Sequence, residues 1–251
     1  MAEAVTFAGF HGDTLEGRWH EPSAPLRGAL VLAHCFTCSK DLTIVSRLAS
    51  QLSDHGYAVL RFDFTGLGES EGTFEQSTFA ANIGDLVRAA LWTTEQTSAP
   101  LGLVGHSLGG AAVLAAAPKI KPVQAMAVIG APASAKHVGS LIEPDVHDRV
   151  QIEGCAYASI AGRTFPISKQ FLDDLDRFDT TNAIADSTIP TMVLHSPEDS
   201  TVLVEEGERI FGLLAQPKAF VPLVGADHLL TNADHIRFAG EQLAMWFGER
   251  L

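Results

Sequence analysis

Short apolar runs alternate with longer segments of helical periodicity along most of this chain. Residues 28–33, 57–62 and 101–104 are three such runs, and in the stretches between them apolar residues recur every three or four positions. Runs that are almost entirely apolar are typical of strands buried on both faces, and their alternation with helices is typical of a mostly parallel sheet covered on both sides. The pattern predicts the α/β class.

The same reasoning predicts the other elements. A helix over 42–52 ends near Gly56, and the Ala-rich helix after residue 107 ends at Pro118. The remaining predictions are a hairpin of residues 5–10 and 15–20, helices at 74–95, 202–214 and 234–247, and strands at 125–129, 191–195 and 219–221.

Residues 132–188 interrupt this alternation. They carry an excess of acidic residues, and an alternating stretch around 150–167 contains an Ala161-Gly162-Arg163 turn. We interpret this segment as a small cap with a hairpin, inserted on the sheet rather than folded as a separate domain. Residues 1–251 are thus expected to form a single domain.

Composition narrows the classes of partner. The 251 residues include 17 basic and 30 acidic side chains, so the formal charge of −13 disfavours nucleic acid and anionic headgroups. No apolar run reaches eighteen residues, and the N-terminus lacks the pattern of a secretory signal, which together predict a cytoplasmic protein that does not span a membrane. A chain of 251 residues is long enough to predict a core that needs no metals or disulfides.

The turn Gly105-His106-Ser107-Leu108-Gly109 lies between a predicted strand and a predicted helix. This is the context in which a G-x-S-x-G string forms a nucleophile elbow, since the two glycines would remove Cβ atoms that collide in so tight a turn. Ser107 is therefore the candidate nucleophile. The alternative is an ordinary serine in a Gly-rich turn.

A nucleophilic serine needs a histidine base that a carboxylate holds in one tautomer. Asp199 follows the strand 191–195 and His228 follows the strand 219–221, so both belong at the sheet edge where Ser107 lies. Glu198 remains an alternative acid and His235 an alternative base, although His235 falls inside a predicted helix. We expect structural roles for four neighbouring residues: His34, His106, His195 and Asp227. Asp227 is expected to brace the loop that carries His228, called the histidine loop below.

The tetrahedral intermediate formed by such a serine needs two amide donors. The N–H of Leu108, directly after the nucleophile, is one candidate. The other is expected in the loop after the strand 28–33, where Phe36 is the candidate donor. Candidates for an acyl or alcohol pocket in the cap are Phe165, Ile167, Phe171 and Leu172, for which a core role is the alternative.

Taken together, these motifs resemble the α/β-hydrolase family over essentially the whole chain. The loop around Phe36 is similar to the His-Gly-Phe-Thr-Gly loop of small carboxylesterases such as cinnamoyl esterases. The segments 34–41, 61–68, 129–132, 169–174 and 225–230 resemble the hydrolase half of bacterial proteins fused to an OsmC-type domain. The resemblance implies an α/β-hydrolase fold, a serine esterase and a functional link to an OsmC-type protein, whose half does not appear before Leu251.

The chain departs from the esterase loop by having cysteine where glycine is expected, at Cys35 and Cys38. Cytosolic thiols are normally reduced, which predicts two small buried thiols. The alternative hypothesis is a Cys35–Cys38 disulfide that reshapes the loop and makes the oxyanion hole sensitive to oxidation. The overall prediction is a serine carboxylesterase for small to medium esters, with a thioesterase, a peptidase or a non-catalytic partner of an OsmC-type protein as alternatives.

Overall fold

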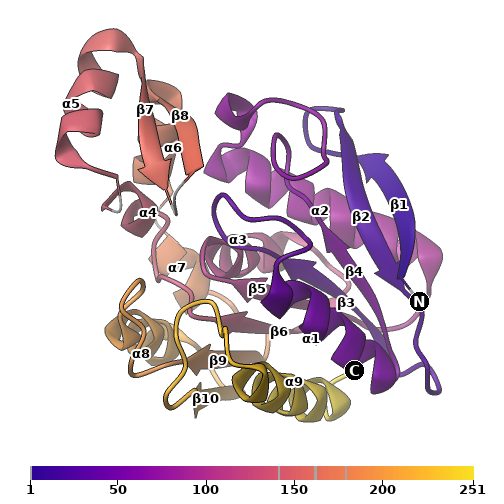
Figure 1. Cartoon of the computed structure of the whole chain (residues 1–251). Helices are drawn as coiled ribbons and strands as arrows, with labels where there is room; N and C mark the ends of the chain where they lie inside the picture. Colours follow the sequence, from indigo (N-terminus) through magenta and orange to yellow (C-terminus); the bar gives the residue numbers. More distant parts are fainter. Residues whose placement is uncertain (1, 141, 161–162, 179) are drawn as a thin grey trace.

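A computed structural model describes residues 2–140, 142–160, 163–178 and 180–251. Its centre is an eight-stranded sheet with the order β1-β2-β4-β3-β5-β6-β9-β10 (Figure 1). The strands are β1 (Ala2–Ala8), β2 (Thr14–His20), β3 (Gly28–Ala33), β4 (Tyr57–Phe62), β5 (Leu101–His106), β6 (Val123–Ile129), β9 (Thr191–His195) and β10 (Lys218–Pro222). From β4 to β10 all strand pairs are parallel, while β1, β2 and β4 pair antiparallel.

Strand register brings the candidate residues to one edge of the sheet. Ala33 pairs with Gly105 between β3 and β5, and His106 pairs with Ile129 between β5 and β6. Parallel neighbours end at the same edge, so the loops that follow these strands meet there. This is the edge at which open α/β sheets place their ligands.

Helices cover both faces of the sheet and bury a separate apolar cluster on each. On one face α1 (Thr43–Asp54) packs with α9 (Ala233–Gly248). On the other face lie α2 (Phe79–Gln96), α3 (Leu108–Ala116) and α8 (Val204–Leu213). The predicted α/β architecture with helices on both sides is confirmed.

Two helices begin at later residues than the sequence predicts. The segment 74–95 divides into a 3₁₀ turn, η1 (Phe74–Gln76), and α2, because the Thr78 side chain accepts a hydrogen bond from the Ala81 N–H and caps a new helix. The helix expected from residue 202 begins only at Val204, since the N–H groups of Thr201 and Val202 bind the Asp199 carboxylate instead. A short η2 turn (Ala117–Lys119) carries Pro118 after α3.

The segment 132–188 contains the expected hairpin, formed by antiparallel β7 (Cys155–Ile160) and β8 (Arg163–Ser168). The predicted turn residues Ala161 and Gly162 lie outside the described residues. The alternating pattern does not begin at residue 150, because 150–153 belong to α5 and Gly154, with a φ of 82°, ends that helix. The other helices here are α4 (Lys136–Ser140), α5 (Pro144–Glu153), α6 (Lys169–Arg177) and α7 (Thr180–Ala185).

Buried side chains of this cap continue the apolar cluster of α2 and α3 rather than forming one of their own. Phe165, Ile167, Phe171 and Leu172 are all buried, between 0% and 7% exposed. Their core role is therefore evident. Among the described helices none is long and apolar enough to cross a membrane.

Candidate active site

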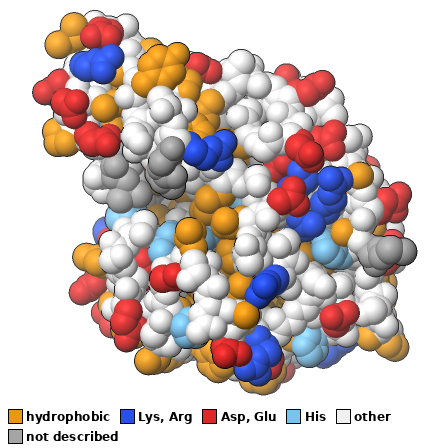
Figure 2. Space-filling model, viewed as in Figure 1, with side chains coloured by type: hydrophobic (Ala, Val, Ile, Leu, Met, Phe, Trp, Pro, Cys, Tyr) orange, Lys and Arg blue, Asp and Glu red, His pale blue; other side chains and the backbone are white. Residues whose placement is uncertain are grey.

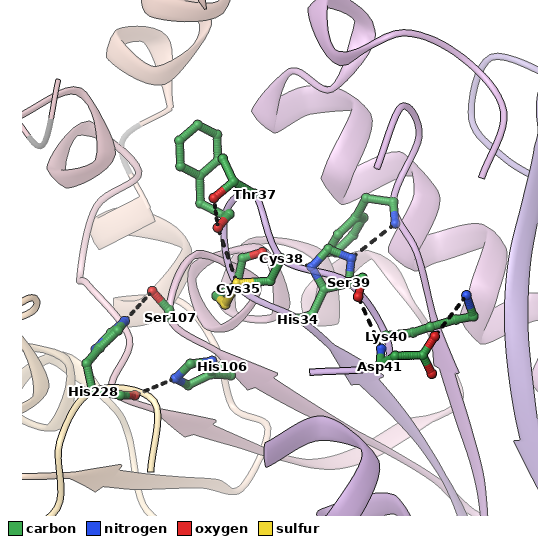
Figure 3. The surroundings of a disulfide bond; sticks show 12 residues. His34, Cys35, Thr37, Cys38, Ser39, Lys40, Asp41, His106, Ser107 and His228 are labelled. Atoms are coloured by element: carbon green, nitrogen blue, oxygen red, sulfur yellow. Dashed lines mark hydrogen bonds and ion pairs between the residues drawn. A yellow bond between two sulfur atoms is a disulfide. The ribbon is translucent and has the colours of Figure 1, made fainter. Parts of the chain in front are cut away.

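Ser107 lies on a tight turn between β5 and α3 with a φ of 55° and a ψ of −124°. A Cβ on Gly105 would lie 2.4 Å from the carbonyl oxygen of Gly109, which explains the glycine there. A Cβ on Gly109 would instead lie 2.3 Å from the carbonyl oxygen of His34. The second glycine thus admits the loop after β3 against the turn. Figure 3 shows Cys35 of this loop and Ser107 of the turn.

The structure brings the three predicted residues together. His228 Nε2 is 3.0 Å from Ser107 Oγ, and His228 Nδ1 is 2.7 Å from Asp199 Oδ2. Ser107 follows β5, Asp199 follows β9 and His228 follows β10, so three strands of one sheet edge supply them. This arrangement allows the imidazole to take a proton from the serine hydroxyl while the carboxylate holds its other nitrogen.

The second oxygen of Asp199 accepts hydrogen bonds from the N–H groups of Thr201 and Val202, both at 2.9 Å. Burial raises the pKa of Asp199, but the hydrogen bond from His228 and those from the two amides outweigh it, so the pKa lies below its usual value. Asp199 is therefore a carboxylate at neutral pH and can only accept from His228.

Glu198, the alternative acid, does not contact His228. It accepts from the N–H of Gly225 at 2.9 Å and from the hydroxyl of Ser196 at 3.2 Å, so it fastens the start of the histidine loop to the loop after β9. The alternative base, His235, lies on α9. Geometry thus favours Asp199 and His228 over both alternatives.

Three further histidines hold the loops around the site. His106 Nε2 is 2.8 Å from the carbonyl oxygen of His228, and burial, followed by the charge of His228, lowers the pKa of His106 to about 3. His195 contacts the carbonyl oxygen of Val202, and His34 that of Cys35, each at 2.8 Å. Asp227 accepts from the N–H of Thr231 at 2.8 Å and from its hydroxyl, as expected for a brace of the histidine loop.

Gly130, which no sequence motif singled out as a site residue, also lies beside Asp199 and His228. It follows β6 with a φ of 53°, and a Cβ there would lie 3.2 Å from Asp199 Oδ2 and 3.4 Å from His228 Nδ1. The glycine lets the backbone pass beside the carboxylate–imidazole pair. Its signals in the sequence are a glycine directly after a buried strand and its place in the segment 129–132, and neither indicates closeness to Asp199 or His228.

The candidate oxyanion donors are placed by the turn and by the loop after β3. In the described part of the chain, neither the Phe36 N–H nor the Leu108 N–H donates to another protein group. Leu108 is the first residue of α3, where a helix leaves its amides unpaired and favours negative charge. An unpaired amide directly after Ser107 suits an oxygen that becomes negatively charged, and the unpaired Phe36 N–H stays the candidate for the second donor.

A disulfide joins Cys35 and Cys38, so the prediction of two free thiols is wrong (Figure 3). The bond closes a ring around Phe36 and Thr37, which the Cys38 N–H reinforces by donating to the Cys35 carbonyl at 3.2 Å. Thr37, inside the ring, has a φ of 60°. The sequence offered both states, and the folded loop brings the two sulfurs together because the chain turns within two residues.

Buried charges fasten the C-terminal end of this loop. The Lys40 ammonium, which is fully buried, lies 2.7 Å from Asp63 Oδ2 and 2.6 Å from Glu69 Oε2. The Asp63 carboxylate also accepts from the Lys40 N–H at 2.6 Å. Burial lowers the pKa of Lys40, but its hydrogen bonds to the Asp63 and Glu69 carboxylates raise it by more than burial lowers it. The pKa therefore lies above its usual value, and Lys40 stays charged.

The tip of the loop touches the cap. The Phe36 ring stacks on Phe171 with centroids 5.4 Å apart, and Phe74 lies 4.8 Å from Phe165. Arg163 of β8 donates to the carbonyl oxygen of Thr37 at 3.2 Å. Figure 2 shows hydrophobic side chains gathered where the cap meets the core. The cap thus packs buried aromatic rings against the loop that carries the proposed oxyanion donor.

Comparison with known proteins agrees with this geometry. The sequence model of a family described as serine aminopeptidase, S33, matches residues 24–151. The esterase domain of a Rhodothermus marinus protein is 39% identical, with a TM-score of 0.80, and the match covers 100% of this chain and 99% of that one. An uncharacterised protein of Salmonella typhimurium, YfhR, is 28% identical over 91% of this chain and 75% of its own length.

A more distant structure shares the fold alone. Est1E from Butyrivibrio proteoclasticus, solved with bound ferulic acid, is 18% identical with a TM-score of 0.85 and covers 98% of this chain and 99% of its own. The family match extends over half of the sequence, and the esterase domain matches it from end to end. The chain therefore belongs to the α/β-hydrolase family, in the serine hydrolase and esterase group that these relatives represent.

Proposed function

We propose that this protein is a serine carboxylesterase that hydrolyses small to medium carboxylic esters through an acyl-enzyme intermediate. The observation that carries the proposal is the hydrogen-bonded series from Asp199 through His228 to Ser107, with distances of 2.7 and 3.0 Å. A serine hydroxyl is a weak nucleophile unless an adjacent base removes its proton, and this series supplies such a base with a fixed tautomer.

In the proposed acylation step, Ser107 Oγ attacks the ester carbonyl as His228 Nε2 takes the hydroxyl proton. The negative oxygen of the tetrahedral intermediate accepts hydrogen bonds from the N–H groups of Phe36 and Leu108. One such donor is worth about 3 kcal/mol of barrier in acyl-transfer enzymes. His228 then gives the proton to the alcohol oxygen as the C–O bond breaks, leaving the acyl group on Ser107.

Deacylation repeats these roles with water as the nucleophile. His228 removes a proton from water, the hydroxide adds to the acyl carbonyl, and collapse of the second intermediate returns the proton to Ser107. Asp199 stays ionised throughout, which is consistent with its lowered pKa. These steps use only side chains and backbone amides of this chain, so the proposed mechanism requires no cofactor.

The choice of an ester over other acyl compounds rests on two observations. The relative that is 39% identical from end to end is described as an esterase domain. The half-buried Phe36 ring is backed by the buried Phe171, and its exposed part offers an apolar contact that suits an acyl or alcohol group of modest size. Because the family description names an aminopeptidase, aminoacyl amides are the informative comparison substrates.

A substrate panel tests the proposal. Aryl esters of increasing acyl length, acyl thioesters and aminoacyl arylamides are compared for kcat/KM, each with wild-type protein and Ser107→Ala. We expect the highest value with an ester, its loss in Ser107→Ala, and covalent labelling of Ser107 by a fluorophosphonate. A higher value with thioesters or arylamides would reassign the bond class. Equal turnover by both proteins would refute catalysis by Ser107.

A further inference from the structure

We propose that the Cys35–Cys38 disulfide is a reducible site that controls the oxyanion loop, residues 34–41 after β3 with the proposed donor Phe36, and that a small dithiol reduces it and lowers the rate of acylation. The inference rests on the proposed esterase function. Its starting point is position: the amide assigned as oxyanion donor, that of Phe36, lies inside the ring that the disulfide closes. The covalent bond therefore encloses a group of the proposed machinery.

The ring constrains a strained backbone. Thr37 has a φ of 60°, a region that a β-branched residue rarely adopts and that costs about 1–3 kcal/mol unless the surroundings impose it. Within the loop, the disulfide and the hydrogen bond from the Cys38 N–H to the Cys35 carbonyl impose it. Opening the ring would let Thr37 relax to negative φ and turn the neighbouring peptides, including the one that carries the Phe36 N–H.

The two flanks of the loop are held independently of the disulfide. On the N-terminal side, the His34 carbonyl packs against Gly109, and the buried His34 ring contacts the Cys35 carbonyl at 2.8 Å. On the C-terminal side, Lys40 is bound to Asp63 at 2.7 Å. Reduction is therefore expected to loosen only residues 36 and 37 and to leave the fold intact.

Contacts from the cap do not replace the ring. Arg163 donates to the Thr37 carbonyl at 3.2 Å, but its side chain is exposed to solvent. The stacking of Phe36 on Phe171 fixes the ring of Phe36 rather than the direction of its N–H. Both contacts can persist while the amide turns away from the oxyanion.

Exposure decides which sulfur reacts. Cys35 is buried, at 5% exposure, whereas Cys38 is half-buried. A thiolate of the dithiol would attack Cys38 Sγ, breaking the S–S bond and releasing Cys35 as a thiolate. The second thiol of the reagent then displaces Cys38 and leaves the reagent as a cyclic disulfide. Two electrons and two protons pass from the dithiol to the two cysteines.

The test compares oxidised and reduced wild-type protein in the aryl-ester assay. Incubation with excess dithiothreitol should raise the number of titratable thiols from one, the exposed Cys155, to three. We expect kcat to fall at least tenfold. The largest fall expected is about 10²–10³-fold, which is the effect of removing one oxyanion donor completely. KM and the circular dichroism spectrum should change little, and reoxidation should restore kcat.

Two variants support the assignment. The double variant Cys35→Ser/Cys38→Ser should have the kcat of the reduced protein and no response to dithiothreitol. Cys155→Ser, which removes the exposed thiol on β7, should respond as wild type does. Full activity with three free thiols, a disulfide that resists the reagent in folded protein, or unfolding on reduction would each overturn the inference. Ester hydrolysis that requires Ser107 in both the oxidised and the reduced protein would still support the proposed function.

Discussion

His106 Nε2 lies 2.8 Å from the carbonyl oxygen of His228, so the residue before the proposed nucleophile braces the main chain of the proposed base. The two rings are also close, with centroids 5.1 Å apart. His106 is buried, and its lowered pKa, about 3, keeps it neutral, so its Nε2–H can donate to that carbonyl without adding a charge beside His228. Any displacement of this brace should move the imidazole relative to Ser107.

Replacing His106 by alanine should therefore lower both activity and stability. The carbonyl of His228 loses its donor, which costs about 1–3 kcal/mol of unfolding free energy. Misplacement of the base should lower kcat by roughly 10- to 100-fold. Kinetics and urea unfolding measure the two effects, and His106→Gln, whose amide can donate to the same carbonyl, should recover part of each. His55→Ala, at the exposed end of α1, is the control.

Asp199 and Glu198 are adjacent carboxylates with different partners, which gives a matched pair of variants. Asp199→Asn removes the acceptor that holds the tautomer of His228, and kcat should fall by about 10⁴-fold, the loss seen when the carboxylate of a Ser-His-Asp triad is replaced by an amide. Glu198→Gln keeps an oxygen that can accept from Gly225 and should retain most of the activity. Similar losses in both variants would contradict the assignment of Asp199 as the acid.

Gly130→Ala tests the close passage of the backbone beside the carboxylate–imidazole pair. The new Cβ would lie 3.2 Å from Asp199 Oδ2, and the φ of 53° disfavours alanine by about 1–2 kcal/mol. We expect a loss of unfolding free energy of that size together with a clear fall in kcat. The readouts are urea unfolding and ester hydrolysis.

Gly154→Ala is the matched control for this variant, because Gly154 also has a positive φ, 82°, but no atom lies within 4 Å of a Cβ there. It should lose similar stability and keep its kcat. If Gly130→Ala also kept its kcat, steric clearance beside Asp199 and His228 would be refuted as the reason for the glycine.

Much of the fold could be predicted because its signals are local. The bounds of β3, β4 and β9 match the predicted runs, since every residue in them is apolar or buried and the turn residues at their ends are distinct. Ser107, Asp199 and His228 could be placed on one edge because each follows a parallel strand. The helices α5 and α6 in the cap were not predicted, since they are short and mostly polar.

Other features depend on contacts that no local pattern carries. Gly130 matters because β6 and the loops after β9 and β10 meet, and Lys40 is buried because Asp63, 23 residues later, lies beside it. The cysteine pair allowed two chemical states, and only the turn of the folded loop decides between them. Long-range packing, rather than composition, determines these features.

Neutral buried histidines predict a loss of stability in mild acid. Burial, followed by the charge of Arg61, lowers the pKa of His20 to about 4, and Arg61 Nε donates to its Nε2 at 3.0 Å. Between the unfolded pKa of about 6.5 and this lower value, only the unfolded chain binds the proton. Stability contributed by His20 is thus present above about pH 6.5 and declines as the pH falls, by up to about 1.4 kcal/mol per unit.

His20→Gln checks this prediction, because the glutamine oxygen can still accept from Arg61 but does not titrate. The unfolding free energy, measured in urea between about pH 5 and pH 7, should depend on pH less steeply than in wild type, by up to about 1.4 kcal/mol per unit. Parallel pH profiles for the two proteins would show that His20 binds a proton equally in both states.

The buried Lys40 ammonium should contribute far more to stability than a lysine in an exposed ion pair. Lys40→Met leaves the Asp63 carboxylate, itself fully buried, without its cation, and loss of one partner from a buried pair costs about 3–5 kcal/mol. Lys169→Met is the matched control, since its 3.0 Å pair with Asp173 is exposed and such pairs contribute about 0.3–0.5 kcal/mol. Urea unfolding of both variants should differ accordingly. Because Lys40 also holds the end of the loop that carries Phe36, the proposed oxyanion donor, its variant should lose kcat while still folded. Equal stability and kcat in the two variants would refute this anchoring role.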